Sequence, residues 1–531
     1  MTDELRDLGQ RVARGQMKRR DFLGRAAALG VALPTALQLL SSTALAAGPN
    51  KGGTIRVGKA HGQTTDSLDP VSWENGFMLD MGFAVFDFLT EIDNGGNLVP
   101  RLAESWEASS DAINWTFKVK KGSEFHNGKS IEAADVAASI NAHRGPDSKS
   151  PAKPIVDPIE DIKVDDKSTL TFVLKNGNAD FPFLMSDYHL AIRPSEEGKI
   201  DVTNPVGSGA YTLEEFEPGV RARGKKFANF HDASKGNFDS FTLLSIVDPA
   251  ARQNALVTGD VDLIDRVDLK TAHLLKRKPG VAVETTTGTQ HYTFPMRTDT
   301  PPFDNADVRL ALKYAVDREA LLKTVLKGYG QLGNDTPIAP SNRYHNKDLP
   351  QRAYDPEKAK FHLKQAGMEN LKVELSAADA AFAGAVDAAV LYKEHAAKAG
   401  IDIEIVREPN DGYWANVWMK KPWCACYWGG RPTEDWMFST AYEAGASWND
   451  TFWSNERFNK LLLLARSELD EEKRRAMYYE MQEIVHNDGG VVVPFFASYV
   501  FARSDKLAYT DPMGANWDLD GARAIERWWF A

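Results

Sequence analysis

Short runs in which apolar and polar residues alternate recur along the chain and predict half-buried strands at residues 54–58, 114–119 and 169–174. Apolar residues at helical spacing predict helices at 76–89, 133–143 and 307–327. Residues 248–264 predict a helix that leads into a strand, and 454–486, rich in charges four residues apart, predict a solvated outer helix. Alternating strands and helices indicate an α/β protein.

The first 46 residues have the pattern of an export signal. Charged residues around Arg19-Arg20 precede an apolar stretch at 26–40, and Ala44-Leu45-Ala46 offers a cleavage site after Ala46. Because Pro34 and Gln38 interrupt the apolar stretch, it is too short and broken to span a membrane. The paired arginines resemble a bacterial twin-arginine signal, with an ordinary secretory signal as the alternative. Either kind of signal predicts that export machinery is a partner of the protein. Either also predicts that the mature protein is soluble, in the periplasm or outside the cell.

Composition narrows the class further. The chain has 63 basic and 74 acidic residues, of which residues 1–46 hold 7 and 4, so the mature chain has 56 against 70 and a net charge of −14. A surface of this sign repels nucleic acid and anionic lipid, and we expect no nucleic-acid partner. Roughly 480 mature residues exceed what one hydrophobic core usually serves, so two or more lobes are expected.

Two cysteines, Cys424 and Cys426, occur two residues apart on an apparent strand. Their side chains point to the same face, and a disulfide between them would be strained. No further His or Cys lies close enough in sequence to complete a metal site. We therefore expect buried free thiols, no bound metal and no cofactor.

Five sequence runs carry a family resemblance. They are residues 115–129 leading into the helix start at 132–136, and residues 205–211, 252–262, 302–328 and 354–359. In this order, behind an export signal, they resemble the family 5 (peptide/nickel type) extracellular solute-binding proteins of bacterial ATP-binding cassette (ABC) importers. The resemblance covers essentially the whole mature chain.

The resemblance implies a bilobed periplasmic-binding-protein fold, with two mixed α/β lobes, a hinge and a ligand cleft between them. Lobe I would comprise residues 47–290 together with 494–531, and lobe II residues 291–493. It also implies that the protein captures a small solute and delivers it to an ABC permease in the inner membrane. Short peptides are the default ligand, while opines, amino-acid conjugates, sugar derivatives and metal chelates stay open.

Several residues in these runs are predicted to be architectural. Gly207 and Gly209 would allow tight turns near the hinge, and Asp135 or Glu132 would cap a helix N-terminus. Asp317-Arg318 is expected to form an intramolecular ion pair.

The sharpest ligand-site candidate is the turn after the apolar strand that ends at Trp428. Gly429-Gly430 is followed by Arg431 and Asp435. By resemblance to the peptide-binding group, Asp435 would take a ligand ammonium, and Trp428 could supply a cation–π face. Arg431 could bind a carboxylate or phosphate with its planar fork of donors. The alternative is that Arg431 and Glu434 pair with each other.

Further candidates come from other parts of the chain. The loop 64–75 follows the first strand, at the strand edge where ligands of α/β proteins collect, and Trp73 is its only aromatic residue. Tyr413 and Trp414 lie in an aromatic-rich segment, and Tyr292 and Arg297 lie at the expected crossover into lobe II.

Two other functional classes compete with that of an importer binding protein. A periplasmic enzyme is disfavoured because the chain lacks His-Glu-x-x-His, Gly-x-Ser-x-Gly and phosphate-loop patterns. No catalytic residue is predicted. A ligand-loaded sensor or chaperone subunit is the remaining alternative.

Overall fold

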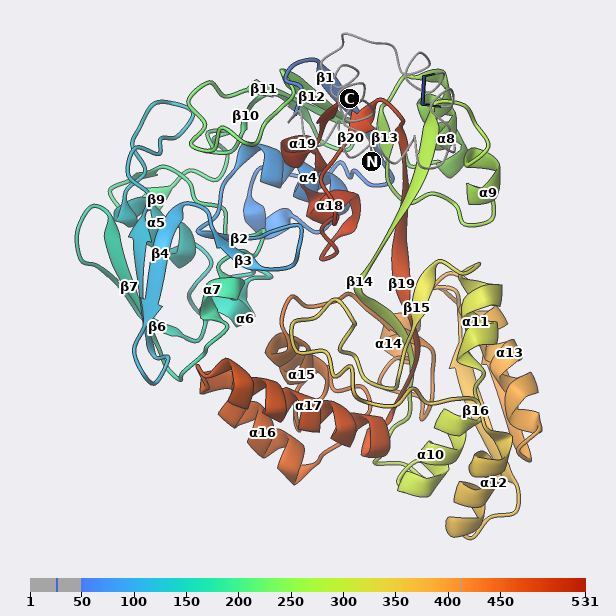
Figure 1. Ribbon diagram of the computed structural model, residues 1–531. Helices are drawn as coiled ribbons and strands as arrows, with labels where there is room; N and C mark the ends of the chain where they lie inside the picture. Colours follow the sequence, from blue (N-terminus) through green and yellow to red (C-terminus); the bar gives the residue numbers. More distant parts are fainter. Residues whose placement is uncertain (1–24, 27–48, 411) are drawn as a thin grey trace.

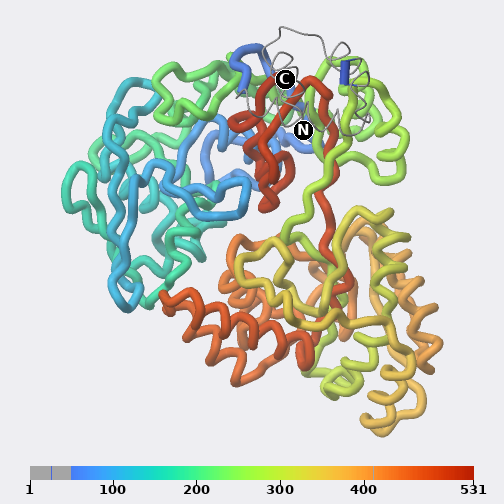
Figure 2. Tube along the Cα trace, in the orientation of Figure 1, coloured from blue at the N-terminus to red at the C-terminus, as the bar shows by residue number. Residues whose placement is uncertain are grey.

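The computed structural model describes residues 25–26, 49–410 and 412–531. Apart from residues 25–26, the predicted signal segment and its cleavage site lie outside this part and stay predictions. Figures 1 and 2 show two bodies joined by two long strands, β14 (Val281–Pro295) and β19 (Val491–Ser504). The α/β class and the bilobed architecture expected from the sequence are confirmed.

Lobe I is built on a mixed sheet in which β1 runs parallel to both β12 and β13. The helix α4 (Gly76–Val85) packs on this sheet, and Asn75 caps it by accepting from two backbone N–H groups. The elements of this region are β1 (Thr54–Lys59), β10 (Tyr211–Glu217), β11 (Arg221–Lys226), β12 (Ser240–Ser245), β13 (Leu263–Ile264), α8 (Pro249–Thr258) and α9 (Ala272–Leu275).

A second unit of lobe I has its own core, formed by an antiparallel sheet of order β4-β5-β7-β6 and the helix α5. The predicted strands 114–119 and 169–174 are two of these strands, and Asp135 accepts from the backbone N–H of Glu132 at the start of α5, as expected of a capping residue. The elements are β2 (Thr90–Ile92), β3 (Leu98–Pro100), β4 (Ala103–Ala108), β5 (Asn114–Val119), α5 (Ala133–Asn141), α6 (Lys153–Val156), β6 (Ile159–Val164), β7 (Thr169–Leu174), α7 (Phe181–Leu184), β8 (Ser195–Glu196) and β9 (Lys199–Ile200).

Lobe II has two cores, one around the parallel pair β16-β17 and one under the helices α15 to α17. Its elements are α10 (Ala306–Tyr314), α11 (Arg318–Val325), β15 (Gly330–Leu332), α12 (Pro356–Gln365), β16 (Leu371–Ala377), α13 (Ala385–Ala397), β17 (Ile401–Arg407), α14 (Tyr413–Asn416), β18 (Cys426–Trp428), α15 (Glu434–Ala441), α16 (Glu456–Ser467) and α17 (Glu471–Asp488). Within the described residues, no helix is both long and apolar enough to cross a bilayer.

The strands β14 and β19 pair antiparallel along most of their lengths and connect the lobes (Figure 1). Their register shifts between Thr287 and His291, opposite Ser498 and Phe496. A second shift lies between Tyr292 and Phe294, and such interruptions loosen the ladder, which suits a hinge. The predicted lobe limits at 290/291 and 493/494 fall inside these two strands and stay a prediction.

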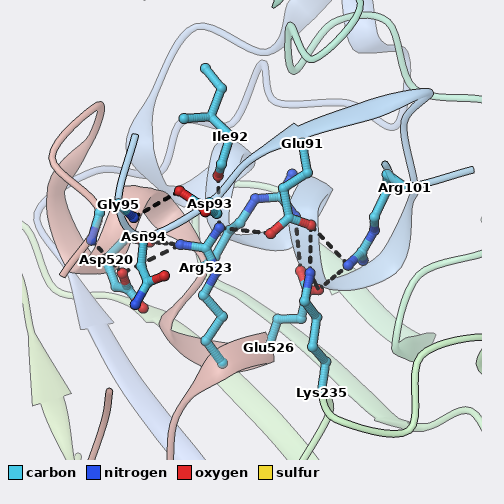
Figure 3. A network of polar contacts seen from close by, with 12 residues as sticks. Glu91, Ile92, Asp93, Asn94, Gly95, Arg101, Lys235, Asp520, Arg523 and Glu526 are labelled. Atoms are coloured by element: carbon cyan, nitrogen blue, oxygen red, sulfur yellow. Dashed lines mark hydrogen bonds and ion pairs between the residues drawn. The ribbon is translucent and has the colours of Figure 1, made fainter. Parts of the chain in front are cut away.

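The chain returns to lobe I after β19 and is held there by a buried ionic network, shown in Figure 3. Arg101 lies 2.9 Å from Glu91 and 2.6 Å from Glu526, while Arg527 contacts Glu91 at 2.7 Å. The contacts join the β2–β3 region to the C-terminal segment, whose elements are β20 (Leu507–Ala508), α18 (Asp518–Ala522), α19 (Ala524–Arg527) and β21 (Trp529–Phe530). This segment is therefore part of lobe I.

The extents predicted for two long helices were wrong. The segment 307–327 is divided into α10 and α11, and 454–486 into α16 and α17. In each case an aspartate starts a new helix, because Asp317 accepts from the N–H of Ala320 and Asp470 from that of Glu472. The chain turns at these caps so that each helix packs separately.

The expected Asp317–Arg318 ion pair was also wrong. Asp317 is occupied as the cap of α11, whereas Arg318 is buried and contacts Asp335 at 2.6 Å, a carboxylate that also pairs with Arg352. Sequence neighbours at a helix start point in different directions, and Arg318 turns toward the core of the lobe.

Gly207 and Gly209 do not lie at the hinge, which corrects the sequence-based expectation. Both residues lie beside the C-terminal end of α4, where the N–H of Gly209 donates to the carbonyl oxygen of Val85 at 2.9 Å. A Cβ on Gly207 would lie 2.1 Å from that oxygen. These glycines permit a close backbone approach inside lobe I.

Replacing Gly207 with alanine is expected to destabilise the protein by about 1–3 kcal/mol, the usual range for forcing an extra carbon into a packed site. Urea unfolding measures this change. Gly429→Ala is the matched control, because a Cβ there meets only the end of the Arg431 side chain, at 4.0 Å. Equal stabilities of the two variants would contradict the close-approach explanation.

Candidate ligand site between the lobes

The predicted Gly-Gly turn is docked against a crossing strand. β18 pairs with β14, placing His291 opposite Trp428 and Tyr292 opposite Tyr427. A Cβ on Gly430 would lie 1.5 Å from the hydroxyl of Thr289, so only glycine fits this position. Thr433 then caps α15 by accepting from the N–H of Trp436. The turn is thereby fixed between the hinge region and a helix.

Arg431 projects from this turn without an acidic partner. Its guanidinium donates to the carbonyl oxygens of Gly429 at 2.9 Å and Gly430 at 3.3 Å, and it makes no ion pair with any described carboxylate. Burial lowers the pKa of Arg431, while Tyr188 and Asp187 of lobe I, which lie across from it, raise that pKa. Arg431 is therefore a partly buried cation at the face between the lobes.

The alternative pairing of Arg431 with Glu434 was wrong. Glu434 is buried and its carboxylate accepts from the backbone N–H of Tyr344 at 2.6 Å. This contact joins α15 to the loop 333–346 and leaves the Arg431 side chain separate. Burial, the largest cause, raises the pKa of Glu434 to about 7.

Asp435 already has a partner inside lobe II. Its carboxylate lies 3.0 Å from Nε of Arg466 on α16 and also accepts from Ser439 at 3.4 Å. Burial raises the pKa of Asp435, and the charge of Arg466 lowers it. Ammonium binding by Asp435 stays a prediction, and this geometry gives it less support than Arg431 receives.

The aromatic candidates divide into enclosed and exposed side chains. Trp428 is 5% exposed and packs against Trp418 and Trp448, and Tyr413 is buried with its hydroxyl donating to the carbonyl oxygen of Ala425 at 2.8 Å. In contrast, Trp414 is 41% exposed and contacts Tyr427, which is 42% exposed, with ring centroids 5.5 Å apart. The exposed aromatic side chains are thus Trp414, Tyr427 and Trp448, which is 49% exposed.

Three other candidates have partners within the protein. Trp73 is fully buried and its indole N–H donates to the carbonyl oxygen of Ser67. Arg297 pairs with Asp299 at 2.8 Å. Tyr292 stacks on Phe382 with centroids 4.2 Å apart and remains partly exposed. Among the three, Tyr292 has the position most suited to a ligand contact.

The sequence reasoning missed Tyr188, Trp517 and Tyr427. Tyr188 of lobe I lies near Arg431 and contacts Trp517, with ring centroids 5.8 Å apart, so lobe I also presents aromatic side chains near Arg431. The alternation of β18 marks Tyr427 as the residue facing opposite to Trp428. For Tyr188 no local signal exists, because a loop places it there.

The structure also contains a cavity of about 340 Å³ farther from the hinge. Residues of lobe I line it, including Trp106 and Trp115, and Ser341 and Arg343 of lobe II close it. None of the predicted ligand residues lines this cavity.

The two cysteines are free and buried, as predicted. Burial raises the pKa of both the Cys424 and the Cys426 thiol, which makes them inert at neutral pH. Across the described residues, no group of three or more His, Cys, Asp or Glu side chains is arranged to hold a metal ion.

Asp450, beside the indole of Trp418, leads to a prediction on the pH dependence of stability. It is 5% exposed and accepts from the indole N–H of Trp418 at 3.0 Å, and burial raises its pKa to about 6, against about 3.9 for an unfolded chain. The stabilisation linked to its protonated form is full below about pH 4 and lost as the pH rises through about 6. The free energy of unfolding of wild type minus that of Asp450→Asn should therefore fall by about 2–3 kcal/mol between pH 4 and 7.

Urea unfolding at pH 4, 5, 6 and 7 measures this difference. Asp147→Asn, at an exposed carboxylate that makes no side-chain hydrogen bond or ion pair with a described residue, serves as the control variant. A difference between wild type and Asp450→Asn that does not vary with pH would rule out this assignment.

Comparison with known proteins agrees with the two-lobed fold. Residues 97–450, about two thirds of the chain, match the model of the bacterial extracellular solute-binding proteins, family 5. The protein belongs to this family and is a solute-binding protein.

Relatives and solved structures extend the match over most of the chain. A glutathione-binding protein of Pectobacterium atrosepticum is 26% identical, covering 84% of this chain and 90% of its own, and a dipeptide-binding protein of Escherichia coli strain K12 is 25% identical over 78% and 84%. The ABC transporter-associated periplasmic binding protein DppA from Helicobacter pylori, solved with peptide STSA, superposes with a TM-score of 0.69 at 24% identity, covering 86% of this chain and 95% of that one. The structural likeness supports the fold.

Proposed function

We propose that this protein captures a small amino-acid-derived solute bearing a carboxylate and delivers it to an ABC permease. The observation that carries the proposal is Arg431, a partly buried guanidinium between the lobes that donates to the carbonyl oxygens of Gly429 and Gly430 and makes no ion pair with a described carboxylate, while Asp187 acts on it from a greater distance. Burying an unpaired cation is costly, and an anionic ligand would offset the cost with charge-assisted hydrogen bonds.

The named ligands of similar proteins support the same chemistry. Glutathione, dipeptides and the peptide STSA all carry a carboxylate, and all are small enough to be enclosed between two lobes. Trp414, Tyr427 and Tyr188 would supply aromatic contacts around the aliphatic part of such a ligand.

Closure of the two lobes suits delivery to a permease, because it hides the ligand from water and presents a new surface to the partner. We propose a periplasmic location reached through the predicted signal segment, with twin-arginine machinery as the exporter. Binding and release require no catalytic step, and none is proposed.

Isothermal titration calorimetry with matched peptides tests the proposal. The probes are glutathione and L-alanyl-L-alanine, each compared with its C-terminal amide. At least one free acid should bind, and its amide should bind at least tenfold more weakly, which corresponds to about 1.4 kcal/mol. Equal binding of acid and amide would contradict a carboxylate contact, and no binding of any probe would contradict the ligand class.

A further inference from the structure

The two lobes also touch away from the crossing strands, where α7 of lobe I meets α16 and α17 of lobe II (Figure 1). Asp180, at the start of α7, pairs with Arg474 of α17. Nη1 of the arginine donates to one carboxylate oxygen at 2.7 Å, and Nη2 lies 2.7 Å from the other oxygen. Both residues are 2% exposed. An enclosed, two-point ion pair therefore joins the lobes.

A backbone hydrogen bond crosses the same boundary. The N–H of Ala179 donates to the carbonyl oxygen of Arg466 at 2.7 Å. Arg466 is in the last turn of α16, where the carbonyl groups have no partner within the helix. Lobe I thus supplies the donor that the end of a lobe II helix lacks.

Aromatic and cationic side chains surround the ion pair. Trp436 of α15 packs against the core of the second unit of lobe I. The guanidinium of Arg343, from lobe II, lies 5.0 Å from the centroid of the Phe183 ring on α7 and 3.8 Å from the carboxylate of Asp180. An ion pair enclosed in this way is stronger than one in water, because its surroundings screen it less.

The contact between the lobes adjoins the turn that carries the candidate ligand residues. Arg466, whose carbonyl oxygen accepts from lobe I, also holds the carboxylate of Asp435 at 3.0 Å from its Nε. The guanidinium of Arg431 lies 5.8 Å from the centroid of the Trp436 ring. The same few residues of lobe II therefore support the turn and meet lobe I.

We propose that the Asp180–Arg474 pair is the centre of a latch that stabilises the closed arrangement of the lobes. Opening would separate the two side chains and return both charges to water. In the closed form, removal of one charge leaves the other buried without a partner, which is costly only while the lobes are together. The latch adds to the free energy of closure without the ligand, so it does not rest on the proposed ligand class.

Double electron–electron resonance on the ligand-free protein tests the latch. Spin labels at Lys163→Cys on β6 and Lys460→Cys on α16, two exposed positions in opposite lobes, report how far apart the lobes are. The two native cysteines are buried and do not compete for the label. Protein with the latch intact should be mainly in a short-distance state. Adding Asp180→Asn should lower the ratio of the short- to the long-distance population by about tenfold or more.

Two further variants complete the design. Arg343→Gln alters the rim of the latch, where the side chain is 33% exposed, and it decides the test if Asp180→Asn does not fold. The ratio should fall by roughly two- to fivefold, because a partly exposed charge contributes less. Asp488→Asn is the matched control, because Asp488 pairs with Arg309 at 2.8 Å within lobe II. It should keep the ratio of the protein with an intact latch.

The outcomes separate the latch from the proposed function. A long-distance state that dominates before any latch residue is changed, or an unchanged ratio in each latch variant that folds, would overturn the latch and leave carboxylate binding on Arg431 standing. An equal fall in Asp488→Asn would also overturn it, because the effect would not be specific to the contact between the lobes. Failure of every peptide probe to bind would overturn the ligand class and leave the latch standing.

Discussion

Replacement of Arg101 with methionine should lower the free energy of unfolding by about 3–5 kcal/mol, the typical loss when one partner of a buried ionic group is removed. Arg101 is 3% exposed and contacts the carboxylates of Glu91 and Glu526 (Figure 3). It also contacts the carboxylate of Asp87. Without it, three buried carboxylates each lose a cationic partner in the contact that holds the C-terminal segment in lobe I, and Lys235 and Arg523 alone still bridge Glu91 and Glu526.

Denaturant unfolding measures the loss, and hydrogen exchange in the segment 507–530 should accelerate in Arg101→Met. Lys153→Met is the control, because its pair with Asp157 at 2.8 Å is on the surface and should contribute less than about 1 kcal/mol. Similar stabilities for Arg101→Met and Lys153→Met would show that the network does not hold the C-terminal segment.

Substitution of Arg431 with alanine should weaken the binding of a carboxylate ligand by roughly 30- to 150-fold, about 2–3 kcal/mol, as expected when one partner of an enclosed charge pair is truncated. The melting temperature of the unliganded protein should change little, since Arg431 has no acidic partner to leave unpaired. Arg431→Lys should keep part of the affinity, because an ammonium retains the charge without the planar fork.

Calorimetry with the peptide that wild type binds measures this effect. Arg475→Ala is the matched control, because Arg475 is also half-buried and makes no ion pair with a described carboxylate, and its side chain donates to the carbonyl oxygen of Arg343 and lies over the Tyr344 ring, away from the predicted site. Wild-type affinity in a folded Arg431→Ala variant would remove Arg431 from the site.

The sequence predicted most of the scaffold because apolar periodicity is a local signal. The strands at 54–58, 114–119 and 169–174 appear nearly as expected. The breaks between α10 and α11 and between α16 and α17 were missed, although Asp317 and Asp470 followed by glutamate within two residues are local signatures of helix starts.

Only the part of the site that neighbouring residues form could be predicted from the sequence. The Gly-Gly turn and the placement of Arg431 come from adjacent residues. The partner of Asp435 is Arg466, 31 positions away, and the residue facing Arg431 is Tyr188 of the other lobe. Such pairings depend on how lobes and helices pack, which spacing along the chain does not reveal.

Native mass spectrometry of the protein purified from the periplasm, followed by denaturation and identification of the released molecule, tests the central claim most directly. The account predicts a small amino-acid-derived solute with at least one carboxylate, released from wild type and depleted in Arg431→Ala. A bound molecule without an anionic group, or equal occupancy in the two proteins, would contradict it.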